Sequence, residues 1–130
     1  FMYLFGRMAD RYTVEVVPGV SSLMACATNL SAPLAARNDI LCVIPGTLDE
    51  TTLADRIGRA DAVAIIKVGR HFEKLRRVID ALGLTHQAKY IEHATMSNQL
   101  ILPLAEVETK HQVPYFSMIL VHTRGEAWHV

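Results

Sequence analysis

At residues 62–67 the chain reads Ala62-Val63-Ala64-Ile65-Ile66-Lys67, and Gly69 interrupts the pattern two positions later. A continuous apolar run of this length is typical of a strand that is covered on both faces of its sheet. A similar run, Ile40-Leu41-Cys42-Val43-Ile44, comes earlier and ends at Pro45. The two runs predict two buried strands, the earlier of them in the centre of an α/β sheet.

Each of these runs is followed by apolar residues at helical spacing. Over residues 53–60 the spacing predicts a helix with Asp49 or Thr51 as its N-cap. Over residues 72–82 it predicts a second helix, and Gly83 suits the position just past the end of that helix. Strand and helix therefore alternate through the middle of the chain, which is typical of α/β domains.

The first thirty residues carry a different mixture of signals. Helical spacing predicts a helix over residues 2–12, and the β-branched residues of 13–17 predict a strand. A Pro-Gly turn follows, after which Ser21 or Ser22 can cap a helix that runs to about Leu30. The predicted order in this part of the chain is helix, strand, helix.

The last third of the chain is rich in strand signals. Residues 89–92, 99–102 and 116–121 predict three strands, and only 104–108 is left for a short helical segment. Connections as short as these suit antiparallel pairing. We therefore expect one α/β domain with a mixed sheet of about five strands, parallel first and antiparallel late, flanked by helices.

Composition limits the classes of function. The chain has 130 residues, of which 51% are hydrophobic and 20% charged, and this suits one globular domain. Thirteen basic residues balance thirteen acidic ones, so we expect neither nucleic acid nor a membrane surface as a partner. Cys26 and Cys42 lie in apolar runs and predict buried thiols of a cytoplasmic protein. The chain begins at Phe1, inside an amphipathic pattern, so we expect a piece of a longer protein.

Familiar catalytic motifs are absent from the sequence. The six histidines lack metal-ligand spacing, so we expect no metal site, and neither a Gly-x-Ser-x-Gly elbow nor a Walker loop occurs. Two strand-to-loop junctions remain, Val17-Pro18-Gly19-Val20-Ser21-Ser22 and Lys67-Val68-Gly69-Arg70. Ligands bind beyond the carboxyl ends of strands in open α/β sheets. From spacing alone, each junction is either a plain turn with a helix cap or part of a small-molecule site.

Several segments together resemble the tetrapyrrole methylase family. Val16-Val17-Pro18-Gly19-Val20-Ser21-Ser22, followed by Ala32-Pro33-Leu34, is similar to the middle signature of that family. Residues 64–69 resemble its strand before an adenosine-contacting loop, and residues 90–95 resemble its strand that ends in Glu-x-x-Thr. Residues 114–121 are similar to its closing strand.

The resemblance implies an activity and a cofactor. Members of the family transfer a methyl group from S-adenosylmethionine to carbon atoms of a uroporphyrinogen-derived ring, by direct displacement and without a metal. Residues 1–5, 67–70 and 114–117 are most similar to the branch that acts on precorrin-2 or cobalt-precorrin-2 in cobalamin biosynthesis. The glycine-rich motifs of the family's amino-terminal lobe are absent. We therefore expect residues 1–12 to be a helix remaining from that lobe or the linker, and 13–130 to form the carboxyl-terminal lobe.

The resemblance also implies that six residues bind the cofactor and that three basic residues are candidates for binding the substrate. Ser21 and Ser22 would contact the methionine portion of the cofactor, Val68 and Ala94 would line the adenosine pocket, and Pro114 and Tyr115 would close it. Arg70 first, and then Arg37 and Lys67, would hold substrate carboxylates. Arginine suits this task because it pairs with carboxylates through two parallel hydrogen bonds. The sequence assigns no catalytic residue.

Other functions fit the same signals. A methylase of the same fold could act on uroporphyrinogen, a later corrin intermediate, a diphthine precursor or ribosomal RNA. A non-catalytic α/β module that binds a small molecule is the alternative of a different class. The family's members are commonly homodimers with ligands between two lobes, so the resemblance implies a homodimer and an inactive isolated lobe.

Overall fold

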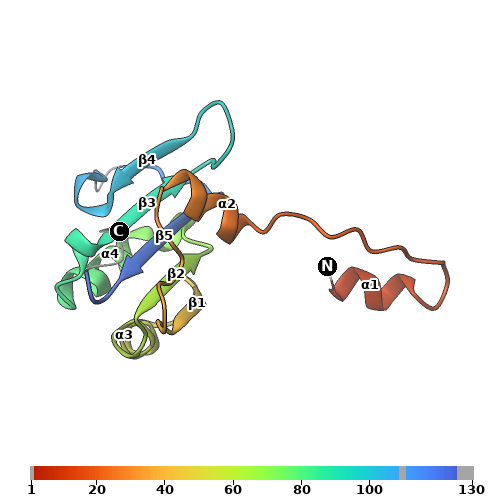
Figure 1. Cartoon of the computed structure of the whole chain (residues 1–130), viewed down its shortest axis with the longest axis horizontal. Coiled ribbons are helices and arrows are strands. Elements are labelled where there is room, and N and C mark those ends of the chain that lie inside the picture. Colours follow the sequence, from red (N-terminus) through yellow and green to blue (C-terminus); the bar gives the residue numbers. More distant parts are fainter. Residues whose placement is uncertain (1, 109–110, 126–130) are drawn as a thin grey trace.

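The computed structural model describes residues 2–108 and 111–125, and its strands form a five-stranded sheet (Figure 1). The strands are β1 (Leu41–Pro45), β2 (Ala62–Ile66), β3 (Ala88–Glu92), β4 (Leu100–Pro103) and β5 (Ser117–His122). Their order across the sheet is β1-β2-β5-β3-β4. β1 and β2 are parallel, whereas the β2–β5, β5–β3 and β3–β4 pairs are antiparallel. The predicted mixed sheet is confirmed.

β1 lies at an edge of the sheet, so the prediction that it is a central strand is wrong. Within the described part of the chain it pairs with β2 alone, and Val43 is 43% exposed. The centre is formed by β2 and β5, and β2 is completely buried from Ala62 to Ile65. A continuous apolar run indicates that both faces of a strand are covered. It does not indicate whether the strand has a neighbour on one side or on both sides.

Helices cover both faces of this sheet, as expected. α3 (Glu50–Arg59) and α4 (Phe72–Ala81) bury Leu53, Ile57, Leu75 and Ile79 completely against one face. On the opposite face, the shorter α2 (Ser22–Asn29) packs Cys26 against Ala64, Met118 and Leu120. The two faces draw on alternate residues of the same strands, because successive strand side chains point in opposite directions.

Local signals set the ends of these helices as predicted. Asp49 is the N-cap of α3, and its carboxylate accepts a hydrogen bond of 2.9 Å from the Thr52 amide. Ser21 is the N-cap of α2, and its hydroxyl accepts from the Leu23 amide at 3.3 Å. Gly83 follows α4 with a φ of +71°, a conformation that glycine adopts without steric cost.

The amino-terminal segment differs most from the prediction. α1 spans only Met2–Met8, and residues 13–17 are extended but form no strand. This segment leads away from the sheet, so α1 has no buried residue and Val17 and Val20 are 80% and 84% exposed (Figure 1). β-Branched residues favour a strand only where a neighbouring strand supplies hydrogen-bond partners and packing.

A short helical segment and two buried thiols were also predicted. The helical segment expected at 104–108 is a single 3₁₀ turn, Leu104–Glu106. Cys26 and Cys42 are free thiols, as predicted, and lie on opposite faces of the sheet, but only Cys26 is buried and Cys42 is half-buried. In the described ranges no helix is long and apolar enough to cross a bilayer.

Candidate functional site

One end of the sheet gathers loops from distant parts of the sequence. The carboxyl ends of β2 and β3 lie there beside the amino end of β5, because β5 runs antiparallel to both. The start of α2 faces the same end (Figure 1). A hollow of about 510 Å³ lies between these elements. Its polar wall includes Ser22, Lys67, His93 and Ser117, and its apolar wall includes Cys26, Ala94, Met96, Tyr115, Phe116 and Met118.

Strained backbone surrounds this hollow. Lys67, His93 and Thr95 have φ values of 56°, 48° and 69°, a left-handed conformation that is uncommon for residues other than glycine. Hydrogen bonds fix the backbone at His93 and Thr95. The His93 amide donates to the Phe116 carbonyl at 2.9 Å, and the Thr95 amide donates to Gln99 Oε1 at 2.7 Å. Such strain persists only where the surrounding structure enforces it, and it concentrates at functional sites.

A smaller hollow of about 380 Å³ adjoins the first and is more basic. Lys67 and Tyr115 belong to both walls, and the smaller hollow adds Arg70 and His71. Partial burial, with smaller contributions from Lys74 and Arg70, lowers the pKa of His71. The positive charge of this hollow at neutral pH therefore comes from Lys67 and Arg70, which suits a carboxylate.

Most of the predicted site residues meet at these two hollows. Ser22, Ala94, Lys67 and Tyr115 line the larger one, and Val68 and Arg70 line the smaller one with Lys67 and Tyr115. Two more lie next to these walls without being part of them. Pro114 precedes Tyr115, and its carbonyl accepts a 2.7 Å hydrogen bond from the Ser117 hydroxyl. Ser21 caps α2 immediately before Ser22.

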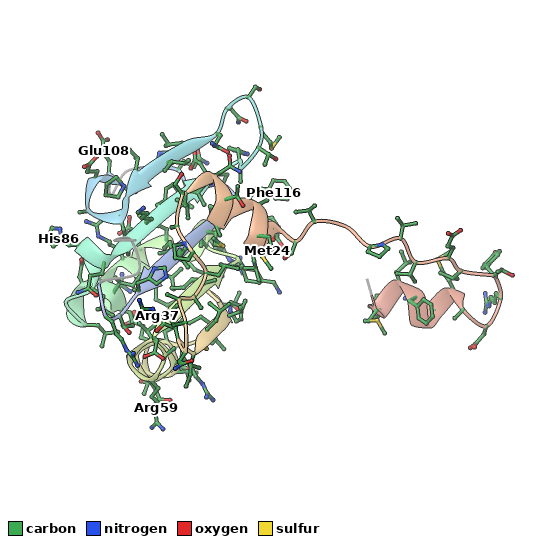
Figure 2. All side chains as sticks on the ribbon, in the orientation of Figure 1. Met24, Arg37, Arg59, His86, Glu108 and Phe116 are labelled. Atoms are coloured by element: carbon green, nitrogen blue, oxygen red, sulfur yellow. The ribbon has the colours of Figure 1, made fainter. Side chains whose placement is uncertain are left out.

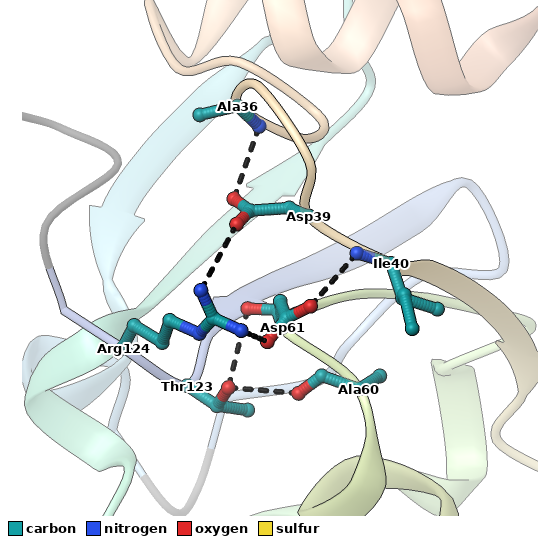
Figure 3. A network of polar contacts seen from close by, with 7 residues as sticks. All are labelled: Ala36, Asp39, Ile40, Ala60, Asp61, Thr123 and Arg124. Atoms are coloured by element: carbon teal, nitrogen blue, oxygen red, sulfur yellow. Dashed lines mark hydrogen bonds and ion pairs between the residues drawn. The ribbon is translucent and has the colours of Figure 1, made fainter.

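Arg37 lies apart from the others. It belongs to the loop before β1, where the Asp39 carboxylate accepts from the Ala36 amide and pairs with Arg124 (Figures 2 and 3). Arg124 also pairs with Asp61, the residue before β2, at 2.5 Å. This loop is therefore tied to the amino end of β2, whereas Lys67 follows its carboxyl end. The structure does not bring Arg37 together with Lys67 and Arg70.

The sequence interpretation missed several residues of the site. Cys26, Met96 and Phe116 form much of the apolar wall, but isolated apolar residues give no sequence signal for a cavity. In the sequence, Glu92 stands out only as part of the motif at residues 90–95. It is buried, and its carboxylate accepts hydrogen bonds from the Tyr90 hydroxyl and from His111 Nε2, the latter at 2.7 Å. A buried carboxylate with a histidine partner far along the chain becomes visible only in the folded structure.

The fold and the position of these hollows define a class, an α/β domain with a small-molecule site at the ends of its strands. Comparison with known proteins then identifies the family. The family model for Tetrapyrrole (Corrin/Porphyrin) Methylases matches residues 1–108, so the chain belongs to that family and the predicted resemblance is confirmed.

Relatives and solved structures agree with this assignment. Over 121 residues, 93% of this chain, it is 40% identical to the Precorrin-2 C(20)-methyltransferase of Sinorhizobium sp. It is 32% identical over 127 residues to the Cobalt-precorrin-2 C(20)-methyltransferase of Salmonella typhimurium. These matches cover 49% and 54% of the two relatives, so the chain spans about half of their length.

The solved structures support the fold. The methyltransferase CobJ superposes with a TM-score of 0.66 at 16% identity, over 93% of this chain and 56% of that one. Uroporphyrin-III C-methyl transferase from Thermus thermophilus, complexed with S-adenyl homocysteine, gives 0.60 at 21% identity over 93% of this chain and 57% of its own.

Proposed function

We propose that the chain is the carboxyl-terminal lobe of an S-adenosylmethionine-dependent methyltransferase that methylates C20 of precorrin-2, or of its cobalt complex, in cobalamin biosynthesis. The observation that carries this proposal is the convergence of Ser22, Lys67, Ala94 and Tyr115 on one hollow. These residues come from four separate segments that resemble the family's motifs. The names of the two relatives described above support the substrate and the ring position.

The residues around the larger hollow fit S-adenosylmethionine. Tyr115 and Phe116 form an edge-to-face pair with centroids 5.5 Å apart, and aromatic faces attract a cation such as a sulfonium. Ala94 is small enough to leave room for a flat adenine ring. At the start of α2, the Ser22 hydroxyl and backbone N–H groups suit the carboxylate of the methionine portion. When bound, S-adenosylmethionine supplies a methyl group that is already activated for transfer.

The chain itself would contribute positioning rather than covalent chemistry. The hollow's walls hold the cofactor in one orientation and exclude water from it, which lowers the entropic part of the barrier. Lys67 and Arg70 border the smaller hollow and hold carboxylate side chains of the tetrapyrrole. Because Lys67 belongs to both walls, it fixes the substrate beside the cofactor. Arg37 has no part in this arrangement.

The oligomeric state and the compartment belong to the same proposal. We propose a homodimer, as the family resemblance implies, and a cytoplasmic location. The exposed apolar side chains of Val17, Val20 and Met24 support an association, because large apolar areas seldom stay in contact with water. The free thiols of Cys26 and Cys42 suit a reducing compartment. Light scattering of the chain and of the longer protein measures the oligomeric state.

A titration with S-adenosylhomocysteine, followed by amide NMR shifts, tests the cofactor assignment. We expect shifts at Ser22, Lys67, Ala94 and Tyr115, and none at Arg37. The Ala94→Leu variant fills the hollow and should weaken binding at least tenfold, whereas the control Ala81→Leu, at an exposed position of α4, should bind like the parent chain. If neither this chain nor the longer protein shows shifts in the hollow, the assignment is wrong. Turnover of precorrin-2 by the longer protein tests the substrate.

A further inference from the structure

Glu92 lies at the centre of a buried polar cluster beneath the site. It ends β3, and its side chain is only 10% exposed. Its carboxylate accepts from the Tyr90 hydroxyl and from His111 Nε2, at 2.7 Å for the histidine. Burial, and secondly Glu92, raise the pKa of Tyr90, so the phenol keeps its proton and donates. A buried carboxylate needs donors of this kind, because burying the charge without them is strongly unfavourable.

The cluster connects His111 to the rigid core. The His111 and Tyr90 rings form an edge-to-face pair with centroids 6.1 Å apart and an interplanar angle of 87°. Tyr90 is fully buried and makes a second edge-to-face contact with Phe72 of α4 at 5.9 Å. The His111 side chain is therefore held by one hydrogen bond and one ring contact, both to buried residues, and the His111 amide donates to the Glu108 carbonyl at 3.0 Å.

The same cluster lies at both ends of the segment that forms a wall of the two hollows. His111 begins this segment, 111–117, and Ser117 ends it opposite Glu92 in the β3–β5 register. Between them, Val113 is half-buried against the core, whereas Tyr115 and Phe116 are 67% and 68% exposed, so packing fixes only part of this backbone. A segment that is packed along only part of its length opens more readily unless its ends are fastened.

We propose that Tyr90, Glu92 and His111 are positioning residues, whose hydrogen-bonded chain fixes segment 111–117 as the wall of the cofactor site. The proposal rests on the proposed function for the identity of the ligand, but the ordering of the segment is measurable without any ligand. These three residues act by holding Pro114–Phe116 in place, and they do not themselves contact a ligand in the hollow.

The His93 amide is a direct reporter of this ordering, because its N–H donates to the Phe116 carbonyl. We expect His111→Leu to speed hydrogen exchange at the His93 amide about tenfold, the effect of losing a hydrogen bond to a charged group. His111→Gln keeps a side-chain N–H donor and should restore slow exchange. The control His86→Leu removes an exposed histidine elsewhere and should leave this amide unchanged.

Hydrogen exchange at the Ala64 and Leu120 amides, in the centre of the sheet, distinguishes a local loosening of segment 111–117 from a loss of stability of the whole domain. Exchange that rises at His93 but not at Ala64 or Leu120 supports the proposal. An equal rise at all three, or no change at His93, overturns it.

Tyr90→Phe provides a second variant that keeps the aromatic core, and it should give the same pattern with a smaller increase. S-adenosylhomocysteine affinity should fall about tenfold in His111→Leu. If the parent chain and the longer protein do not bind this ligand, the proposed function fails, whereas the exchange data still decide the ordering.

Discussion

Replacing Gly46 with alanine tests the closest backbone approach near the site. Gly46 follows β1, and its amide donates to the Ile66 carbonyl at 2.7 Å. A Cβ atom at this position would come 2.9 Å from Leu75 Cδ1 and 3.0 Å from the Lys67 carbonyl oxygen. Leu75 is completely buried and Lys67 is part of the strained turn after β2, so neither neighbour can move away cheaply.

The expected cost follows from this geometry. Adding a methyl group to a packed core costs about 1–3 kcal/mol, and the two close contacts place Gly46→Ala near 2 kcal/mol. For a domain of this size, that corresponds to a fall of about 8 °C in Tm. It also corresponds to a fall of about 1 M in the urea midpoint, for a typical slope of about 2 kcal/mol/M.

A matched glycine in α3 provides the control. Gly58 lies on the exposed side of the helix, and a Cβ there would meet nothing within 4 Å. Gly58→Ala should therefore stabilise the chain by about 0.5 kcal/mol, through its higher helix propensity. Urea unfolding followed by circular dichroism measures both variants. If Gly46→Ala is neutral or stabilising, the close approach of the β1 end to Lys67 is not as the structure has it.

Three further perturbations test other parts of the fold. Asp61→Ala removes the acceptor for the Ile40 amide and the ion-pair partner of Arg124. It should lower the free energy of unfolding, measured with urea, by about 1–2 kcal/mol. Burial lowers the pKa of His122 from its ordinary 6.5, so the unfolded chain binds the proton more readily. Stability should therefore fall as the pH drops below about 6.5, and His122→Gln should flatten that dependence; an unchanged pH profile contradicts the assignment. Burial also raises the pKa of the Cys26 thiol, so iodoacetamide should modify it more slowly than a free cysteine, and bound S-adenosylhomocysteine should slow it further. Modification at the rate of free cysteine would show that Cys26 is not buried.

Under the proposed function, the two hollows bind different parts of the ligands because their chemistry differs. The larger has an apolar and aromatic wall with few polar groups, which is typical of a nucleoside site. The smaller has Lys67 and Arg70 at its rim, which is typical of a carboxylate site. Their shared residues, Lys67 and Tyr115, sit at the boundary. Substitutions there should affect both ligands, whereas Arg70→Ala should raise the KM for the tetrapyrrole and leave cofactor affinity unchanged.

Local physical chemistry accounts for the parts of the fold that were predicted correctly. The α3 helix could be read from the spacing of Leu53 and Ile57 and from the cap at Asp49, because these interactions span only a few residues. The same is true of Gly83, whose positive φ is a property of one residue. The strands of the last third could be predicted from their own residues, and the short connections between them predicted their antiparallel pairing.

Local sequence patterns were enough to predict the class of fold, the family and most of the segments that meet at the site. Contacts between distant segments were needed to show that β1 is an edge strand, that residues 13–17 pair with no strand in the described part of the chain, and that Arg37 lies at the opposite end of the sheet from Lys67. It also decided that His111 reaches Glu92, nineteen residues earlier in the chain. The reason is the range of the interactions: helix periodicity and capping are set within one or two turns, whereas neighbours in a sheet and partners of a buried carboxylate are set by contacts between distant segments.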